Sequence, residues 1–144
     1  MPRKIIVGFD GSASSGRALD FAIERARAQG DEILIVHVLE WSPYSFLTKE
    51  EVAERHRRRS DELQRANDAI IAPVLGRVEA AGVTAHSQLQ YGHVAETLCR
   101  IAETEDTAMI MIGRTGDSGF AKRFFGSVAA TLAQVAPVPV TIVP

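Results

Sequence analysis

The sequence is poor in cysteine, in net charge and in long apolar runs, and each scarcity excludes a class of protein. The single cysteine, Cys99, cannot form an internal disulfide, so we expect a reducing, cytoplasmic setting. A formal net charge of −2 on 144 residues gives no overall attraction to nucleic acid or to a membrane surface. No apolar run is long enough to span a bilayer, and the first residues show no secretory signal. We therefore expect neither a nucleic-acid partner nor membrane insertion.

The overall composition is that of an ordinary globular protein. Hydrophobic residues make up 46% of the chain and charged residues 24%, a balance that supports a packed core rather than disorder. The length suits one domain and leaves little room for a second. We expect a single domain that covers residues 1–144.

Strand-like and helix-like segments alternate along the whole chain. Apolar, strand-like segments lie at 5–9, 33–39, 83–91, 109–112 and 138–142. Segments with helical spacing lie between them, from 14 to 30, 48 to 82, 94 to 105 and 127 to 135. This alternation predicts an α/β fold with an open, doubly wound, five-stranded parallel sheet, with helices on both faces and the strand order 3-2-1-4-5.

Two prolines refine this prediction. Pro73 should kink or break the second helical segment, because proline lacks the N–H and its ring clashes with the preceding turn. Pro139 removes a ladder donor from the last strand and so places that strand at a sheet edge. An apolar edge strand readily pairs with another chain. We therefore expect a homodimer through the strand that begins at Val138 and ends at Val143.

A glycine-rich loop follows the fourth expected strand. Gly113 and Gly116 allow the backbone to approach a ligand closely, and Gly126 and Ser127 stand where the last helix is expected to begin. Free N–H groups at a helix N-terminus, together with the helix dipole, favour an anion. This pattern predicts that the loop holds the phosphates of a nucleotide.

The expected strand order brings further residues to the same place. Ligands of doubly wound sheets bind beyond the carboxyl ends of the strands, where the strand order reverses. Asp10 ends the first strand and Val38 ends the second. Asp10 could accept hydrogen bonds from ribose hydroxyls or help to hold a Mg²⁺ ion that accompanies the phosphates, and Val38 could form an apolar wall for the base. The alternative for Asp10 is that it only caps the following helix.

Other polar residues have plainer interpretations. Arg114, Lys122 and Arg123 are either cations for the phosphates or ordinary surface residues. His37 lies within an apolar strand and is expected to be packed, as is Cys99 on its helix. We assign no catalytic residue, because no general base, nucleophile or arginine finger is evident.

The chain resembles the universal stress proteins of the UspA superfamily, and the resemblance covers essentially its whole length. The motifs that carry it are the strand followed by Asp10-Gly11-Ser12, the pair His37-Val38, the segment Y-G-x-x-A-E-T-L-x-x-I-A from Tyr91 to Ala102, and the final glycine loop. In that loop G-x-x-G is followed by nine residues and then G-S. This spacing resembles the ATP-binding branch of the superfamily.

The resemblance implies roles for individual residues. It implies that Asp10 lies near the ribose and the metal, that Val38 contacts adenine, and that Gly126, Ser127 and Val128 contact the phosphates. It also implies the five-stranded fold and a dimer in which the last strands pair in antiparallel fashion.

We therefore expect a module of the stress response or of regulation that binds ATP, or ADP or AMP, with Mg²⁺, and that has little or no catalysis of its own. A protein partner that the sequence does not identify would respond to nucleotide occupancy. Two alternatives stay open: a slow ATPase or nucleotide hydrolase, and a dimeric scaffold that binds no nucleotide.

Overall fold

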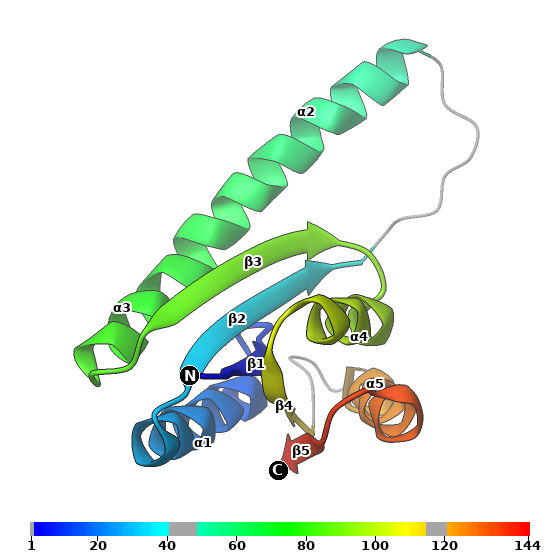
Figure 1. The fold of residues 1–144 in the computed structure, drawn as a ribbon. Helices are drawn as coiled ribbons and strands as arrows, with labels where there is room; N and C mark the ends of the chain where they lie inside the picture. The colour runs from blue at the N-terminus through cyan, green and yellow to red at the C-terminus, as the bar shows by residue number, and fades with distance from the viewer. Residues whose placement is uncertain (1, 41–48, 115–120) are drawn as a thin grey trace.

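The strands form one parallel sheet with the expected order. The computed structural model describes residues 2–40, 49–114 and 121–144 (Figure 1). The strands in these ranges are β1 (Lys4–Gly8), β2 (Glu32–Leu39), β3 (Ala85–Tyr91), β4 (Thr107–Gly113) and β5 (Val140–Val143). They pair in parallel in the order β3-β2-β1-β4-β5. The predicted fold class and strand order are confirmed.

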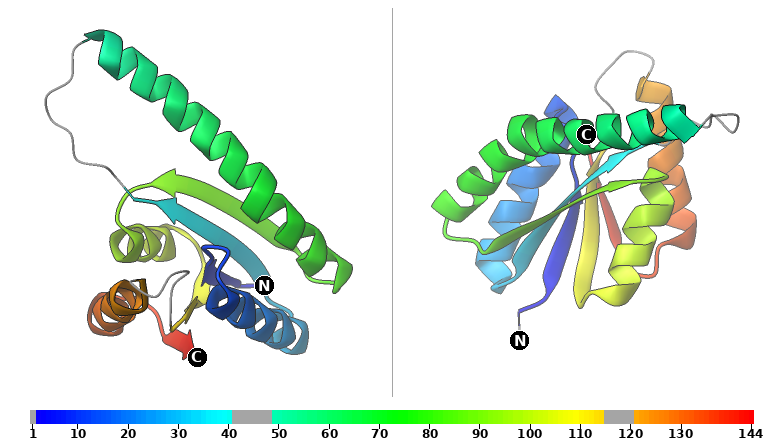
Figure 2. Two further views of the ribbon diagram at one scale, coloured as in Figure 1. Left: turned by 180° about the vertical axis from the view of Figure 1, so that it is seen from behind. Right: turned by 90° about the horizontal axis from the view of Figure 1, so that it is seen from above.

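Helices cover both faces of the sheet (Figure 2). They are α1 (Ala13–Gln29), α2 (Lys49–Ala66), the π-helical segment η1 (Asn67–Ile71), α3 (Ala72–Ala80), α4 (Val94–Thr104) and α5 (Ala121–Val135). Side chains from α1, η1 and α3 pack on one face, and side chains from α4 and α5 pack on the other. None of the described helices is both long enough and apolar enough to cross a membrane.

Alternation along the strands divides the core into two layers. On β1, Ile5 and Val7 point into the α1 layer, whereas Ile6 points into the α4–α5 layer. On β2, Ile35 points into the α1 layer and Val36 into the α4–α5 layer. All five of these side chains are at most 1% exposed. A strand buried on both faces needs a continuous apolar sequence, which explains the unbroken runs in the central strands.

Local signals set the ends of α1. Ser12 is its N-cap, and the Ser12 Oγ atom accepts a hydrogen bond of 3.1 Å from the Ser15 N–H. Gly30 ends the helix with φ +74°, a left-handed conformation that favours glycine. The helix predicted to end at Gly30 is therefore confirmed.

Pro73 distorts the second helical segment without ending it. The turn before the proline widens into η1, in which the Ala72 N–H donates to the Asn67 carbonyl five residues earlier. The wider turn separates the proline ring from the preceding carbonyls and lets the chain continue as α3. Ile71, in the same turn, is fully buried in the α1 layer.

Several expected boundaries were wrong. β3 begins at Ala85 instead of residue 83, and β5 begins at Val140 instead of Val138, so Pro139 lies just before the edge strand and not within it.

The last helix, predicted to begin at Ser127, begins at Ala121, so Gly126 and Ser127 lie within it. Residues 121–125 contain three strong helix formers and neither proline nor glycine. A glycine inside a helix costs only about 1 kcal/mol relative to alanine, which good neighbours can offset.

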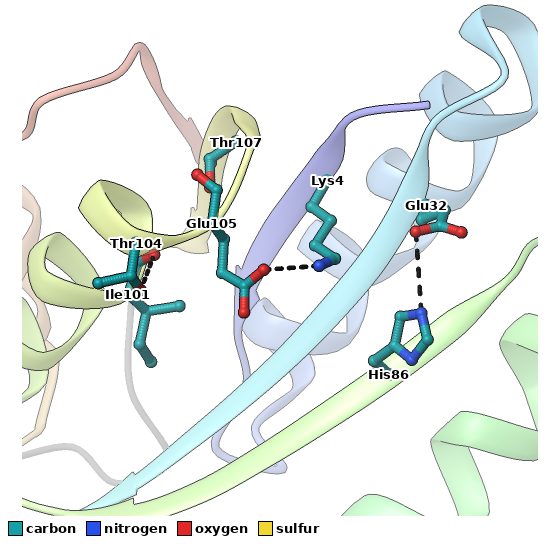
Figure 3. Close-up of polar contacts among 7 residues, drawn as sticks. All are labelled: Lys4, Glu32, His86, Ile101, Thr104, Glu105 and Thr107. Carbon is teal, nitrogen blue, oxygen red and sulfur yellow. Dashed lines mark hydrogen bonds and ion pairs between the residues drawn. The ribbon is translucent and has the colours of Figure 1, made fainter. Parts of the chain in front are cut away.

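Polar contacts between side chains close the amino-terminal edge of the sheet (Figure 3). The Lys4 Nζ atom lies 2.6 Å from Glu105 Oε2, and this hydrogen bond raises the pKa of the lysine ammonium. On the neighbouring strands, His86 Nε2 lies 3.8 Å from Glu32 Oε2. These contacts tie β1 to the turn before β4, and β3 to β2. The described side-chain contacts at the amino-terminal ends of the strands therefore stabilise the sheet.

A tyrosine fastens the long α2 helix to the sheet. α2 extends away from the sheet in Figure 1, and the Tyr91 hydroxyl at the end of β3 donates to the Glu62 carboxylate. The Arg59 guanidinium lies 5.4 Å from the centroid of the same ring. Desolvation, and then the hydrogen bond to Glu62, raise the pKa of Tyr91 to about 12.

We predict that Tyr91 ionises well above the ordinary tyrosine pKa of about 10. The neutral phenol is favoured in the folded state, so its contribution to stability is complete below about pH 10 and is lost as the pH rises towards 12. In a Tyr44→Phe background, ultraviolet titration should show one late phenolate transition. Glu62→Gln should move it to lower pH, whereas Glu54→Gln should not, because Glu54 pairs with Arg58. A wild-type midpoint near 10 would contradict the assigned contacts.

Candidate functional site

A pocket opens at the carboxyl edge of the sheet, where the strand order reverses. Its cavity volume is about 180 Å³. The ends of β1, β2 and β4 and the helices α4 and α5 contribute its lining: Gly8, Phe9, Asp10, Val36, His37, Val38, Glu40, Val94, Ile112 and Val128. The position agrees with the general location of ligand sites in doubly wound sheets.

The structure brings three of the predicted site residues together. Asp10, Val38 and Val128 all line the pocket. Gly113 directly follows a lining residue of β4, and Ser127 directly precedes Val128, although neither lines the cavity itself. Arg114 is exposed just beyond β4, and Gly126 lies within α5. Gly116 lies outside the described residues, and Lys122 and Arg123 have no described side-chain environment.

The apolar wall of the pocket is the open end of the α4–α5 core layer. Val36, Val38 and Ile112 belong to that layer, together with Val94 from α4 and Val128 from α5. The layer is fully packed deeper in the sheet but is not filled at the carboxyl edge. A flat, apolar group such as a nucleobase suits this opening.

Gly8 allows the strands to approach closely beneath the opening. A Cβ atom at Gly8 would lie 3.0 Å from Ile112 Cγ2 and 3.3 Å from Leu98 Cδ1. Both distances are tighter than ordinary carbon contacts. The glycine therefore lets β4 and α4 pack against β1 at the floor of the site.

Asp10 shapes the turn after β1 and also faces the pocket. Its Oδ1 atom accepts a 2.9 Å hydrogen bond from the Ser12 N–H, in the manner of an Asx turn. The N-cap itself is Ser12, so the alternative in which Asp10 caps the helix is not what the structure shows. The hydrogen bond fixes one carboxylate oxygen and orients the other. Gly11, with φ +84°, allows the chain to turn at this point.

His37 joins β1 to β2 beside the pocket. Its side chain is 6% exposed, and Nδ1 lies 2.7 Å from the Phe9 carbonyl oxygen. A carbonyl oxygen only accepts, so Nδ1 carries a proton and donates it in this contact. The histidine thus holds the ends of the two strands in register.

Gly113 has a packing role that the sequence did not reveal. A Cβ atom there would lie 2.7 Å from the Ser14 carbonyl carbon and 2.8 Å from the Ser15 nitrogen. These are backbone atoms of the first turn of α1, which cannot easily move aside. The glycine is therefore needed for β4 to pass the start of α1, whatever its relation to a ligand.

The main-chain amides of Gly126 and Ser127 are not at a helix N-terminus. Because α5 begins at Ala121, regular helix geometry pairs these amides with carbonyls in the preceding turn. Ser127 is exposed, and its carbonyl accepts a 2.8 Å hydrogen bond from Thr131 Oγ1. In the described part of α5, the main-chain N–H groups of these two residues are therefore not free to bind an anion, contrary to the prediction.

Several lining residues were not predicted from the sequence, and Glu40 is the most reactive of them. Val36 and Val94 add apolar wall, whereas Glu40 adds a second carboxylate to the lining that contains Asp10. The period of two along a strand could have found Glu40, because it lies two residues beyond Val38. Across the described residues, no group of three His, Cys, Asp or Glu side chains is placed to hold a metal ion.

We predict that Gly113→Ala lowers the free energy of unfolding by about 1–3 kcal/mol, the usual cost of overpacking. The added methyl group would meet the backbone of Ser14 and Ser15. Gly16→Ala is the matched control. Gly16 lies on α1, the helix that Gly113 contacts, and a Cβ atom at Gly16 has nothing within 4 Å. It should stabilise α1 by about 0.5–1 kcal/mol, because alanine is the better helix former. Chemical denaturation measures both, and equal stabilities for the two variants would contradict the packing described.

Comparison with known proteins agrees with this architecture. The family model described as "Universal stress protein family" matches residues 1–144. A curated relative, the universal stress protein YxiE of Bacillus subtilis, is 29% identical over 147 aligned positions, which cover 99% of each chain.

Solved structures extend the comparison. The universal stress protein UspA from Lactobacillus plantarum superposes with a TM-score of 0.84 at 20% identity, covering 99% of this chain and 97% of that chain. A universal stress protein in complex with cAMP superposes with a TM-score of 0.64 at 26% identity, covering 99% and 97%. The match of the family model over the full sequence, together with this shared fold, shows that the chain belongs to the universal stress protein family.

Proposed function

We propose that this protein binds an adenine nucleotide in the pocket at the carboxyl edge, and that it acts as a nucleotide-dependent module of the stress response or of regulation. ATP is the proposed ligand, with ADP and AMP as the alternatives. The observation that carries the proposal is the convergence of Asp10, Val38 and Val128 on one pocket at the strand-order reversal. The relative in complex with cAMP supports the choice of an adenine nucleotide.

The strand order supports a proposal for how the nucleotide lies across the pocket, with its base near β2 and its phosphates near β4. β2 contributes Val38, the central β1 contributes Asp10, and β4 with α5 contributes Ile112 and Val128. The apolar β2 end suits the base, and the carboxylate in the middle suits the ribose hydroxyls. The phosphates would then lie towards the β4–α5 end, close in sequence to Arg114 and Ser127.

At the phosphate end we propose contacts from the Ser127 hydroxyl and the Arg114 guanidinium, both of which are exposed. Gly126 would leave room for the phosphates. Contacts from the Gly126 and Ser127 amides would require the helix to begin later, so that these N–H groups become free. Gly116 is proposed as part of the same loop, although it lies outside the described residues.

Asp10 also fits a magnesium ion that arrives with the nucleotide. Mg²⁺ commonly takes one or two protein carboxylates, with water and phosphate oxygens as its other ligands. One oxygen of Asp10 is held by the Ser12 N–H, which leaves the second oxygen oriented for this use. When bound, the ion would supply charge neutralisation for the phosphates.

We propose little or no intrinsic catalysis. Among the described lining residues there is no serine, cysteine, lysine or arginine, and the Nδ1 proton of His37 is already donated to Phe9. The signal would then be occupancy itself, which a protein partner in the cytoplasm would recognise. A steady turnover of many ATP molecules per protein would favour the slow ATPase instead.

We expect Gly126→Val to lower ATP affinity about tenfold or more, because a branched side chain would enter the phosphate position. Isothermal titration calorimetry measures the affinity, and native mass spectrometry of the protein as purified reveals any nucleotide that copurifies. Gly76→Val is the matched control: it places the same side chain at a helical glycine with open space around it. Equal affinities for wild type and Gly126→Val would remove the role assigned to Gly126, and no binding by the wild type would refute the proposed function.

We also propose a homodimer through the outer edge of β5. This strand lies at one end of the sheet, and Ile142 on it is 40% exposed. Val135, at the end of α5, adds a second exposed apolar side chain. A two-fold pairing of β5 with its copy would satisfy the open ladder groups of the edge.

We predict that Ile142→Asp converts the dimer to a monomer, because the substitution places a charge in the pairing edge. Light scattering at several protein concentrations measures the mass in solution. Gln29→Asp adds the same charge at the exposed end of α1 and should leave the dimer intact. A monomeric wild type would show that the open edge is not used in this way.

A further inference from the structure

We infer that Glu40 selects the base of the ligand: its carboxylate accepts a hydrogen bond from the exocyclic amino group of adenine and disfavours purines that carry an oxygen at the same position. The inference rests on the proposed function and adds a residue that determines specificity. Its basis is that Glu40 lines the pocket at the end where the base is proposed to lie.

Glu40 directly follows the last residue of β2, Leu39. Val36, Val38 and Glu40 are spaced two residues apart, and all three line the pocket. Val36 is 1% exposed, Val38 is half-buried and Glu40 is exposed. The series runs from the core to the rim of the pocket, and the carboxylate stands at the rim.

Glu40 places a carboxylate acceptor at this end of the pocket. Within the described parts of the chain, its carboxylate has no hydrogen-bond or ion-pair partner. The other lining carboxylate, that of Asp10, accepts from the Ser12 N–H and lies on the central strand. The wall next to Glu40 is apolar, formed by Val38 and Val94. A polar edge of the base therefore finds its partner at Glu40.

The chemistry of a carboxylate makes this contact selective. An ionised carboxylate only accepts hydrogen bonds, and the exocyclic amino group of adenine donates them. Hypoxanthine carries a carbonyl oxygen in place of that amino group, so two acceptors would face each other. The difference lies in one functional group, and discrimination is the difference between the two affinities.

The test compares ATP with ITP, which have the same sugar and the same phosphates. We expect the wild type to bind ATP about tenfold or more tightly than ITP, the ratio expected of one charge-assisted hydrogen bond. Glu40→Gln should bring the ratio close to one, because an amide can both donate and accept. Glu24→Gln removes the same charge from an exposed position on α1, and it should keep the wild-type ratio. Calorimetry with both nucleotides measures all six affinities.

The outcomes separate this inference from the proposed function. A Glu40→Gln variant that keeps the wild-type ratio, or a wild type that binds ATP and ITP equally, would overturn the role of Glu40 while nucleotide binding stands. A wild type that binds neither nucleotide would overturn both. Because Glu40 is exposed at the end of a strand, the variant should fold, and a thermal melt confirms that it does.

Discussion

The parallel pairing of β1 with β4 is the constraint on which the site depends. It places Gly8 opposite Ile112 across more than half of the chain, and it brings the turn at Asp10 beside the loop that follows β4. Such non-local contacts form only after the entropy of closing a long loop has been overcome. Once they form, the helices on either side of the reversal diverge, and the pocket lies in the space between them.

Residues around the pocket also hold the fold together. Gly113 was expected to admit a phosphate, but its most direct contact is with the first turn of α1, where any larger residue would collide. Asp10 both holds the turn after β1 and faces the pocket. A ligand-binding role proposed for a glycine or an aspartate of this kind therefore needs a matched stability control.

The sheet could be predicted from the sequence because its information is local and periodic: apolar runs, helical spacing and a few glycines and prolines. Right-handed crossovers limit the possible strand orders, and the order 3-2-1-4-5 was taken from the common doubly wound arrangement. The predicted start of α5 was wrong because Gly126 and Ser127 were taken as a helix start, although residues 121–125 favour a helix and contain no breaker. The contact of Gly113 with Ser14 could not be predicted in this way, since it joins segments that become neighbours only in the folded chain. Strand periodicity could have predicted Glu40, because it lies two residues after Val38, the residue that was chosen.

The two ends of the strands differ in what they carry. Ion pairs such as Lys4–Glu105 lie at the amino ends, and the largely apolar pocket lies at the carboxyl ends. Strands of this length hold the two ends roughly 15 Å apart, beyond the range at which substitutions usually influence one another. Substitutions among the paired side chains at one end should therefore change the free energy of unfolding without reshaping the pocket at the other end.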